Sequence, residues 1–276
     1  MILLSLFALV LCASLLGFWS LRPPSLLPAD LPGSQAHKGH PRKTLIAGGP
    51  AILLAFLATG LVLGDGGGLG FPRNWALLGA LALGLLDDYR HLPWVPKLLG
   101  QCLIAYLAAR SLPGVSPALS LPLLVLLMNA WNYLDNSDGC LAFVAIFGLL
   151  GLALAGAPIP YFLLGCLLGF LPFNWPRARF FLGDSGSQFV GLTMGLLVFD
   201  LGGLSLAALG VQLLPLADLL QVSLVRLLEH RPPWIGDRRH LAHLLERRLP
   251  KPLIAPLLGI LSFALSFLLY RSGGIG

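Results

Sequence analysis

Charged residues are scarce in this chain of 276 residues. Asp, Glu, Lys and Arg make up 11% of it, whereas 57% of the residues are hydrophobic; ordinary soluble domains carry about 25% charged residues. A water-soluble core does not explain that balance. Cysteine is also rare, with four residues and no CxxC pair, so the sequence indicates neither a zinc site nor a disulfide framework.

Long apolar runs recur along the whole sequence. A helix needs roughly 20 apolar residues to cross a bilayer core, and Leu-rich runs without alternation favour helices over barrel strands. Pro215 and Asp218 interrupt the ninth run, so we expect that helix to break. The sequence predicts one all-α domain over residues 1–276, a polytopic transmembrane bundle of about ten spans at 2–19, 45–63, 74–86, 97–110, 118–134, 140–156, 159–172, 186–200, 203–228 and 252–270.

The basic residues predict the orientation of this bundle. Of 18 Lys and Arg, only Arg73, Arg110 and Arg271 fall outside the loops that follow odd-numbered spans and the helix ends beside those loops. The positive-inside rule therefore places those loops in the cytoplasm and both termini on the periplasmic, outer side. Topology and attraction to anionic lipid explain the net charge of +6, so no nucleic-acid partner is expected.

Five carboxylates lie where three apolar spans reach the predicted cytoplasmic side. A charged side chain costs about 2.5–3.5 kcal/mol at the centre of a span, and gathered carboxylates with few lysines beside them are natural ligands for Mg²⁺. One such residue could be a solvated helix end, but five together favour a site. Neighbouring helical residues point about 100° apart, so the two adjacent aspartates are expected to do different jobs. The five are Asp87, Asp88, Asp135, Asp138 and Asp184.

Polar residues extend this pattern along one helix. Asn129, Asn132 and Asp135 recur at i, i+3 and i+6, which gives an apolar helix a polar stripe at its end. The stripe points into a site or forms a hydrogen-bonded seam between helices. Asp184 opens a later span, where free N–H groups attract an anion or where the residue simply caps the helix.

A histidine pair lies in the last large cytoplasmic loop. His240 and His243 stand at i and i+3 beside Arg238 and Arg239, and on a helix they would share one face. Such a face suits phosphate or pyrophosphate. By itself it could equally be a basic patch next to the membrane.

Four segments together resemble the polyprenyl-phosphate N-acetylhexosamine-1-phosphate transferase family, the glycosyltransferase family 4 enzymes of the WecA and MraY types. The resemblance covers about residues 37–245, and its strength lies in the order of the motifs, because each alone is weak. The segments are DDYRHLPWVPKLLGQ from Asp87, NAWNYLDNSDG from Asn129, FNWPRARFFLGDSGS from Phe173 and RPPWIGDRRHLAH from Arg231.

The resemblance implies a Mg²⁺-dependent enzyme, with Mn²⁺ as a substitute metal, at the cytoplasmic face of the bacterial inner membrane. It would transfer a sugar 1-phosphate from a UDP-N-acetylhexosamine to polyprenyl (undecaprenyl) phosphate and release UMP, the first membrane step of a cell-envelope glycan. A homodimer is compatible with it. By resemblance, Asp87 would act as base with Asp88 beside it, Asp184 and Asn132 would hold the metal, Lys97, Asn129, Asp135, Asp138 and Asn174 would surround the nucleotide and diphosphate, and Arg238, His240 and His243 would grip the sugar phosphate.

Several alternatives remain open. The triple-His string of the MraY type is absent, which favours the WecA-like branch, but a phospho-N-acetylmuramoyl-pentapeptide transferase stays an alternative. A CDP-alcohol phosphotransferase motif beginning at Asp135 fails at Phe143, where that motif requires Arg. The non-enzymatic alternatives are a membrane transporter, which would place its aspartates deep in the bilayer, and a catalytically dead relative that binds lipid.

Overall fold

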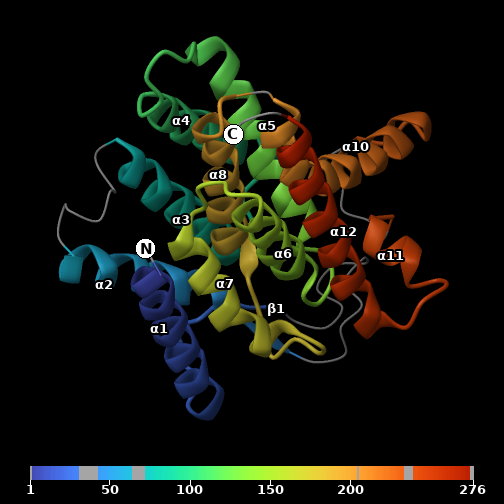
Figure 1. Cartoon of the computed structure of the whole chain (residues 1–276). Helices are drawn as coiled ribbons and strands as arrows, with labels where there is room; N and C mark the ends of the chain where they lie inside the picture. Colours follow the sequence, from blue (N-terminus) through green and yellow to red (C-terminus); the bar gives the residue numbers. More distant parts are fainter. Residues whose placement is uncertain (1, 31–42, 64–71, 204, 233–238, 274–276) are drawn as a thin grey trace.

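The computed structural model describes residues 2–30, 43–63, 72–203, 205–232 and 239–273, and these form a bundle that is nearly all α-helical (Figure 1). A three-stranded sheet is its one other regular feature within those ranges. The helices are α1 (Ile2–Leu21), α2 (Gly48–Leu63), α3 (Arg73–Arg90), α4 (Trp94–Ala109), α5 (Pro117–Leu134), α6 (Cys140–Leu154), α7 (Tyr161–Asn174), α8 (Gly183–Asp200), α9 (Leu206–Leu209), the 3₁₀ helix η2 (Gly210–Gln212), α10 (Leu213–Leu228), α11 (Leu241–Leu245) and α12 (Lys251–Ser272).

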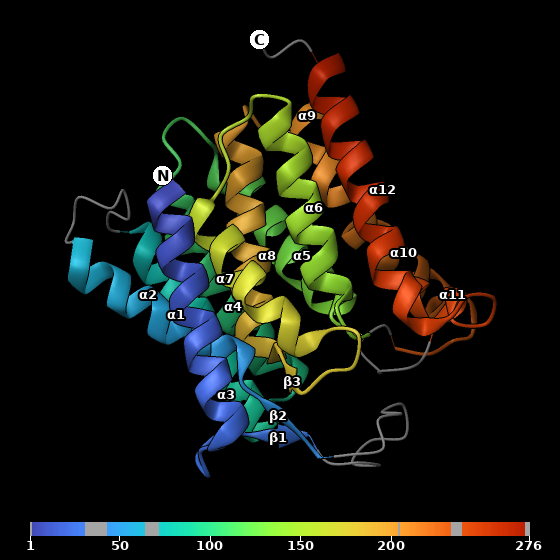
Figure 2. The same ribbon diagram turned by 60° about the horizontal axis from the view of Figure 1, so that its bottom comes forward.

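The small sheet ties together segments that are far apart in the chain. Strand β1 (Ala29–Asp30) pairs antiparallel with β2 (Thr44–Ile46), which pairs parallel with β3 (Phe180–Phe181). The sheet lies at the end of the bundle opposite to the start of α1 and the end of α12 (Figure 2). The sequence pattern had predicted a span from residue 45; instead the chain stays extended through Ile46, where pairing with Phe181 supplies its hydrogen bonds, and α2 begins at Gly48.

Helix α8 forms the centre of the bundle, packed between α3 and α5 (Figure 1). Its side chains are buried on all sides, including Phe189, Val190 and Met194. Such a helix must face other helices around its whole circumference. Residues at its first turn are therefore held in place by neighbours from several directions.

Four helices among the described residues are long and apolar enough to cross a bilayer: Ile2–Leu21, Pro117–Leu134, Gly210–Leu228 and Lys251–Ser272. Four shorter apolar helices accompany them, at Gly48–Gly60, Trp94–Ala109, Cys140–Leu154 and Tyr161–Asn174. The chain is a multi-pass membrane protein. The count of ten spans and the side on which the termini lie stay predictions.

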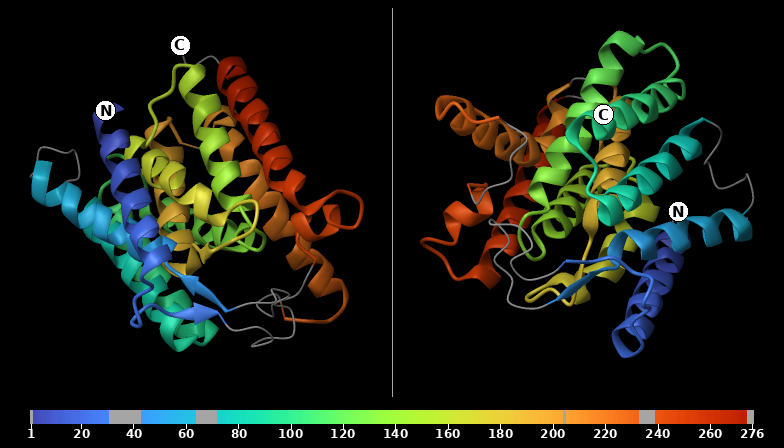
Figure 3. Two further views of the ribbon diagram at one scale, coloured as in Figure 1. Left: turned by 90° about the horizontal axis from the view of Figure 1, so that it is seen from below. Right: turned by 180° about the vertical axis from the view of Figure 1, so that it is seen from behind.

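The ninth predicted span is broken, as expected from its sequence. It divides into α9, η2 and α10, and α10 projects away from the bundle (Figures 1 and 3). The break lies before Pro215, because a proline in the first turn of a helix removes no needed hydrogen bond. Asp218 therefore lies inside an intact helix and is fully buried.

Candidate functional site

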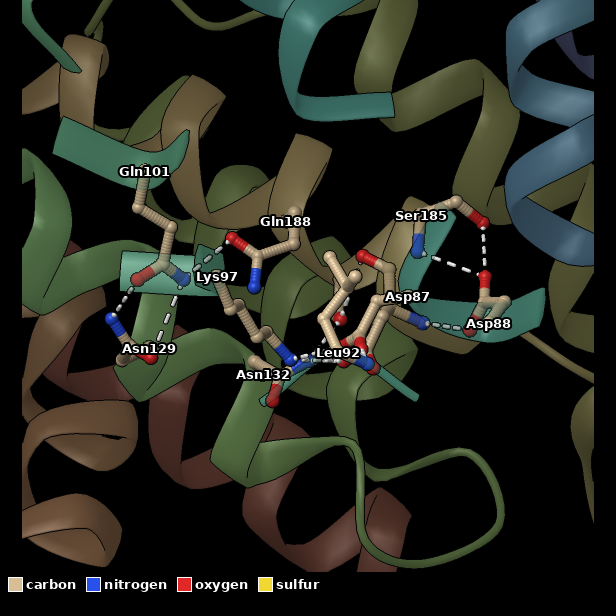
Figure 4. Close-up of polar contacts among 11 residues, drawn as sticks. Asp87, Asp88, Leu92, Lys97, Gln101, Asn129, Asn132, Ser185 and Gln188 are labelled. Atoms are coloured by element: carbon tan, nitrogen blue, oxygen red, sulfur yellow. Dashed lines mark hydrogen bonds and ion pairs between the residues drawn. The ribbon is translucent and has the colours of Figure 1, made fainter. Parts of the chain in front are cut away.

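Two carboxylates and one lysine meet where three helices begin or end; Asp87 and Lys97 are labelled in Figure 4. Asp87 lies in the last turn of α3, Lys97 in the first turn of α4 and Asp184 in the first turn of α8. The Nζ atom of Lys97 is 2.6 Å from Oδ2 of Asp87 and 3.2 Å from Oδ1 of Asp184. Because the lysine side chain is only 20% exposed, its charge neutralises two carboxylates at short range with little screening by water.

Asp87 and Asp88 point to different partners, as the 100° separation predicts. Oδ1 of Asp87 accepts the backbone N–H of Leu92 at 2.6 Å, which closes the turn between α3 and α4. Asp88 accepts the backbone N–H groups of Asp184 and Ser185 at 2.8 and 3.1 Å, and the Ser185 hydroxyl at 2.8 Å. Asp88 thus caps α8 from another helix. Its predicted place beside the catalytic base stays a prediction. Asp87 is left facing Lys97.

Two glycines allow α3 to approach α8 this closely. A Cβ atom at Gly84 would overlap the backbone of Asp184 and Ser185. Gly183 has φ +78°, and a Cβ atom there would meet the carboxylate of Asp88. Only glycine satisfies both conditions without strain.

Asn132 joins the acidic cluster from α5. Its Nδ2 donates to the carboxylate of Asp184 and, at 2.7 Å, to the hydroxyl of Ser187. The structure therefore brings together the two residues that were predicted to hold a metal. Their binding role stays a prediction.

A buried chain of amides lies beside this cluster. Asn129 Nδ2 donates to the carbonyl of Val125 at 2.8 Å and to Oε1 of Gln101 at 2.9 Å, and Nε2 of Gln101 donates to Oε1 of Gln188 at 3.0 Å. A carbonyl only accepts, so Val125 fixes the orientation of all three amides. The Nε2 atom of Gln188, which has no hydrogen-bond partner among the described residues, is turned away from Gln101 (Figure 4).

The loop after α5 holds the remaining predicted acids. Asp135 is half-buried; burial, and then the charges of Asp184, Asp88 and Asp138, raise its pKa to about 8. Asp138 forms an ion pair with Lys251 at 3.3 Å.

Asn174 joins the end of that loop to strand β3 through hydrogen bonds to the backbone. Its Oδ1 accepts the N–H of Gly139 at 2.8 Å, its Nδ2 donates to the carbonyl of Phe180 at 3.0 Å, and the residue is 4% exposed. Both ends of the amide thus hold backbone. The predicted contact of Asn174 with nucleotide stays a prediction.

The histidine pair forms a second cluster. Nδ1 of His240 is 2.8 Å from Oδ2 of Asp218, Nδ1 of His243 is 3.2 Å from Oε2 of Glu246, and the two rings lie 6.2 Å apart. Arg238, predicted to bind with them, lies outside the described residues.

The last turn of α5 connects the two clusters. Asn132 contacts Asp184, while the ring of the next residue, Tyr133, packs edge-on against His240 with centroids 5.6 Å apart. Arg226, which is 2% exposed, donates to the Tyr133 hydroxyl at 3.0 Å. The sequence analysis gave Arg226 no place in the site, although a charge inside the apolar run 203–228 was a signal for it.

The donor chemistry fits a hard divalent cation. No group of three or more His, Cys, Asp or Glu side chains in the described part of the chain is arranged to hold a metal. Mg²⁺, however, is often held by one or two carboxylates and completed by substrate phosphates and water. Asp184 supplies a carboxylate, and the Asn132 amide offers an oxygen when it is turned over. Lys97 joins Asp87 to Asp184.

Comparison with known proteins finds one family model and several curated relatives. Residues 74–202 match the model of glycosyl transferase family 4. The chain is 29% identical to the decaprenyl-phosphate N-acetylglucosaminephosphotransferase of Mycolicibacterium smegmatis, over 70% of this chain and 61% of that protein. It is 30% identical to the undecaprenyl-phosphate alpha-N-acetylglucosaminyl 1-phosphate transferase of Thermotoga maritima, over 67% and 64%. These matches therefore span less than two thirds of either relative.

A third relative is matched over more of its length. The phospho-N-acetylmuramoyl-pentapeptide-transferase of Deinococcus radiodurans is 33% identical over 72% of this chain and 76% of that protein. The relatives thus include enzymes of both types that the motifs resemble.

Proposed function

We propose, since this chain belongs to glycosyl transferase family 4, that it transfers a sugar 1-phosphate from a UDP-N-acetylhexosamine to a polyprenyl phosphate and releases UMP. The observation that carries the proposal is the meeting of Asp87, Lys97, Asp184 and Asn132 at the ends of four helices. The names of the relatives supply the class of acceptor and of the transferred group.

The reaction exchanges one phosphoanhydride bond for another. A lipid phosphate oxygen attacks the sugar-bearing phosphorus, the bond to the UMP oxygen breaks, and UMP leaves with the electron pair. Little covalent chemistry is left for the protein, so positioning and charge neutralisation dominate. Asp87 faces the cluster and takes the proton of the incoming lipid phosphate, while Lys97 neutralises the negative charge around it.

Asp184 and Asn132 would hold Mg²⁺, or Mn²⁺ in its place. The bound cation supplies neutralisation of the diphosphate. Asp88 holds the first turn of α8, so that Asp184 stays near Asp87 and Lys97. His240 and His243, with Arg238, bind the sugar 1-phosphate end of the donor, and Asp135 and Asp138 border the nucleotide.

The proposed enzyme is one integral membrane domain with this site at the cytoplasmic face of the bacterial inner membrane. The support is the excess of basic residues in the odd-numbered loops. The acidic cluster and the histidine cluster both adjoin the end of α5, next to the loop at residues 135–139. A water-soluble nucleotide sugar would meet the lipid phosphate at that level of the membrane.

The test is UMP release by the purified protein with undecaprenyl phosphate and a panel of UDP-N-acetylhexosamines. We expect release that needs lipid and metal and that is restored after chelation by Mg²⁺ or Mn²⁺. Asp87→Asn should reduce it by at least about 100-fold, in the range reported for loss of a general base. Asp200→Asn, a matched change at the other end of α8, should leave it unaltered. No release with any sugar from folded protein would refute the proposal.

A second donor belongs in the same panel. The 33% identity to a phospho-N-acetylmuramoyl-pentapeptide-transferase favours UDP-N-acetylmuramoyl-pentapeptide as the alternative substrate. Turnover with that donor alone would assign the chain to the second type.

A further inference from the structure

Asp218 is a buried carboxylate that both the motifs and the proposed mechanism leave without a role. It is 0% exposed within α10. Its Oδ2 is 2.8 Å from Nδ1 of His240, and its Oδ1 accepts the backbone N–H of Leu241 at 2.6 Å. Nδ2 of Asn136 approaches Oδ2 at 3.5 Å. A buried charge is costly unless it is paired and hydrogen-bonded, and here each oxygen has a specific partner.

These contacts determine which nitrogen of His240 carries hydrogen. An ionised carboxylate can only accept, so the ring nitrogen that faces it must be an N–H donor. This geometry assigns the ring hydrogen to Nδ1. Nε2, at the opposite edge of the ring, has no hydrogen bond among the described residues and is left for another partner.

The orientation of the ring is restrained as well as its tautomer. Tyr133 packs edge-on against it at 5.6 Å, and His243 lies 6.2 Å away. Asp218 also holds the start of α11 through Leu241, the residue directly after His240. One carboxylate thus fixes both the backbone and the ring of the same residue.

We propose that Asp218 is a positioning residue, which fixes the tautomer and direction of His240 so that Nε2 meets an oxygen of the sugar 1-phosphate of the donor. The ligand in this statement rests on the proposed function; the pairing of Asp218 with His240 does not. Asp218 itself acts only through the histidine.

Asp218→Asn separates the two tasks of the carboxylate. The N–H of Leu241 needs an acceptor, so the new amide must keep its oxygen there and present its NH₂ group to His240. Two donors cannot face each other, so Nδ1 loses its hydrogen and Nε2 gains one. The variant keeps the shape of the side chain and its bond to α11.

The direct test is ¹⁵N NMR of histidine-labelled protein in lipid bilayers, because the chemical shift distinguishes an imidazole N–H from a bare nitrogen. The signal of His240 is assigned by its loss in His240→Gln. We expect a hydrogen on Nδ1 in the wild type and a bare Nδ1 in Asp218→Asn. A bare Nδ1 in the wild type, or an unchanged Nδ1 in the variant, would overturn the proposal.

Kinetics supplies a second arm. Asp218→Asn should lower kcat/KM for the UDP-sugar by about 10–100-fold, the range known for loss of a partner that orients a metal-binding histidine, with the KM for polyprenyl phosphate unchanged. In a His240→Gln background, the same change should cost nothing further. An equal loss in both backgrounds would show that Asp218 does not act through the ring of His240 and would contradict the proposal.

The two arms fail in different ways. If the wild type turns over no UDP-sugar, the proposed function is wrong, while the NMR result still decides whether Asp218 sets the tautomer. Asp200→Asn serves as the control in both arms, because it makes the same chemical change in a residue paired with Arg73 rather than with a histidine.

Discussion

Asp87 and Asp88 show how the chemistry of this chain depends on the direction of single side chains. Asp87 is 5% exposed and Asp88 is 8% exposed, so burial does not distinguish them. Their partners do: a lysine and a turn for the first, and the N-terminus of α8 for the second. A carboxylate that accepts three hydrogen bonds is poorly placed to take a proton from substrate. This supports Asp87 rather than Asp88 as the proposed base.

Asp135 gives a prediction about pH. Burial and neighbouring charges raise its pKa from 3.8 to about 8. Between these values the folded chain holds a proton that the unfolded chain has released, so stability falls as pH rises from about 4 to 8. Asp135→Asn has no ionisable group at this position and therefore removes this loss of stability. Its thermal stability in detergent should exceed that of the wild type by a margin that grows over this range to about 1–2 kcal/mol, less than the full shift because the side chain is half-buried.

The measurement is a series of melting curves for both proteins from pH 4 to pH 9. We expect the two to coincide near pH 4 and the margin to become constant above pH 8. A margin that does not change with pH would mean that Asp135 ionises normally in the folded protein.

The sequence identified the charged residues of the candidate site but few of the residues that contact them. Asp87, Asp184 and Lys97 stand out because charge is rare in apolar runs, and the structure brings them together. Gln188 and Asp218 also stand in apolar runs, yet their partners lie 87 and 22 residues away. Gln188 meets its partner only when α8 packs against α4, and Asp218 meets His240 only when the loop after α10 folds back. No local pattern could predict either contact.

At the level of helices, the site depends on how closely α3 packs against α8. Gly84 permits that approach, because any side chain there would displace the backbone at Asp184. The cap from Asp88 then holds the two helices together. The distance between Asp87 and Asp184 is therefore set by helix packing.

Gly84→Ala tests this dependence. The added methyl group should destabilise the protein by about 1–3 kcal/mol through overpacking, and it should lower UMP release by more than tenfold by moving Asp184. Gly60→Ala is the matched control: Gly60 is a helical glycine with no other atom within 4 Å of an added Cβ. It should raise stability by roughly 0.5–1 kcal/mol with unchanged activity. Equal behaviour of both variants would contradict the packing argument.

Helix prediction succeeded where periodicity and breakers decide the structure. Each predicted span corresponds to a helix or, in the ninth case, to a broken one. It failed at Leu45 and Ile46, because apolar residues before a Gly pair read equally well as the start of a helix. Their partner strand, Phe180–Phe181, is far away in sequence, and strand pairing of that kind leaves no local signal.

The acidic cluster lies at one end of the molecule. The sheet and the acidic cluster lie near one another, and the ion pair between Arg73 and Asp200 joins the start of α3 to the end of α8, away from the cluster. The family resemblance read from four motifs is confirmed by the match to glycosyl transferase family 4. Orientation in the membrane depends on the distribution of charge, and it stays a prediction.

Labelling from each side tests that orientation. In a chain without its four native cysteines, Arg177→Cys lies in the loop before β3 and Arg110→Cys lies at the end of α4. An impermeant maleimide should react with the second in intact spheroplasts and with the first only after permeabilisation, because basic loops stay in the cytoplasm. The reverse result would invert the proposed topology.

The most direct measurement of the central claim uses a UDP-N-acetylhexosamine labelled with ³²P at the phosphorus that bears the sugar. Incubation with polyprenyl phosphate and Mg²⁺ should move the label into the lipid and release unlabelled UMP, and Asp87→Asn should reduce this transfer by at least about 100-fold. Label that stays in UDP while the sugar moves to lipid, or label that never leaves the donor, would contradict transfer of a sugar 1-phosphate.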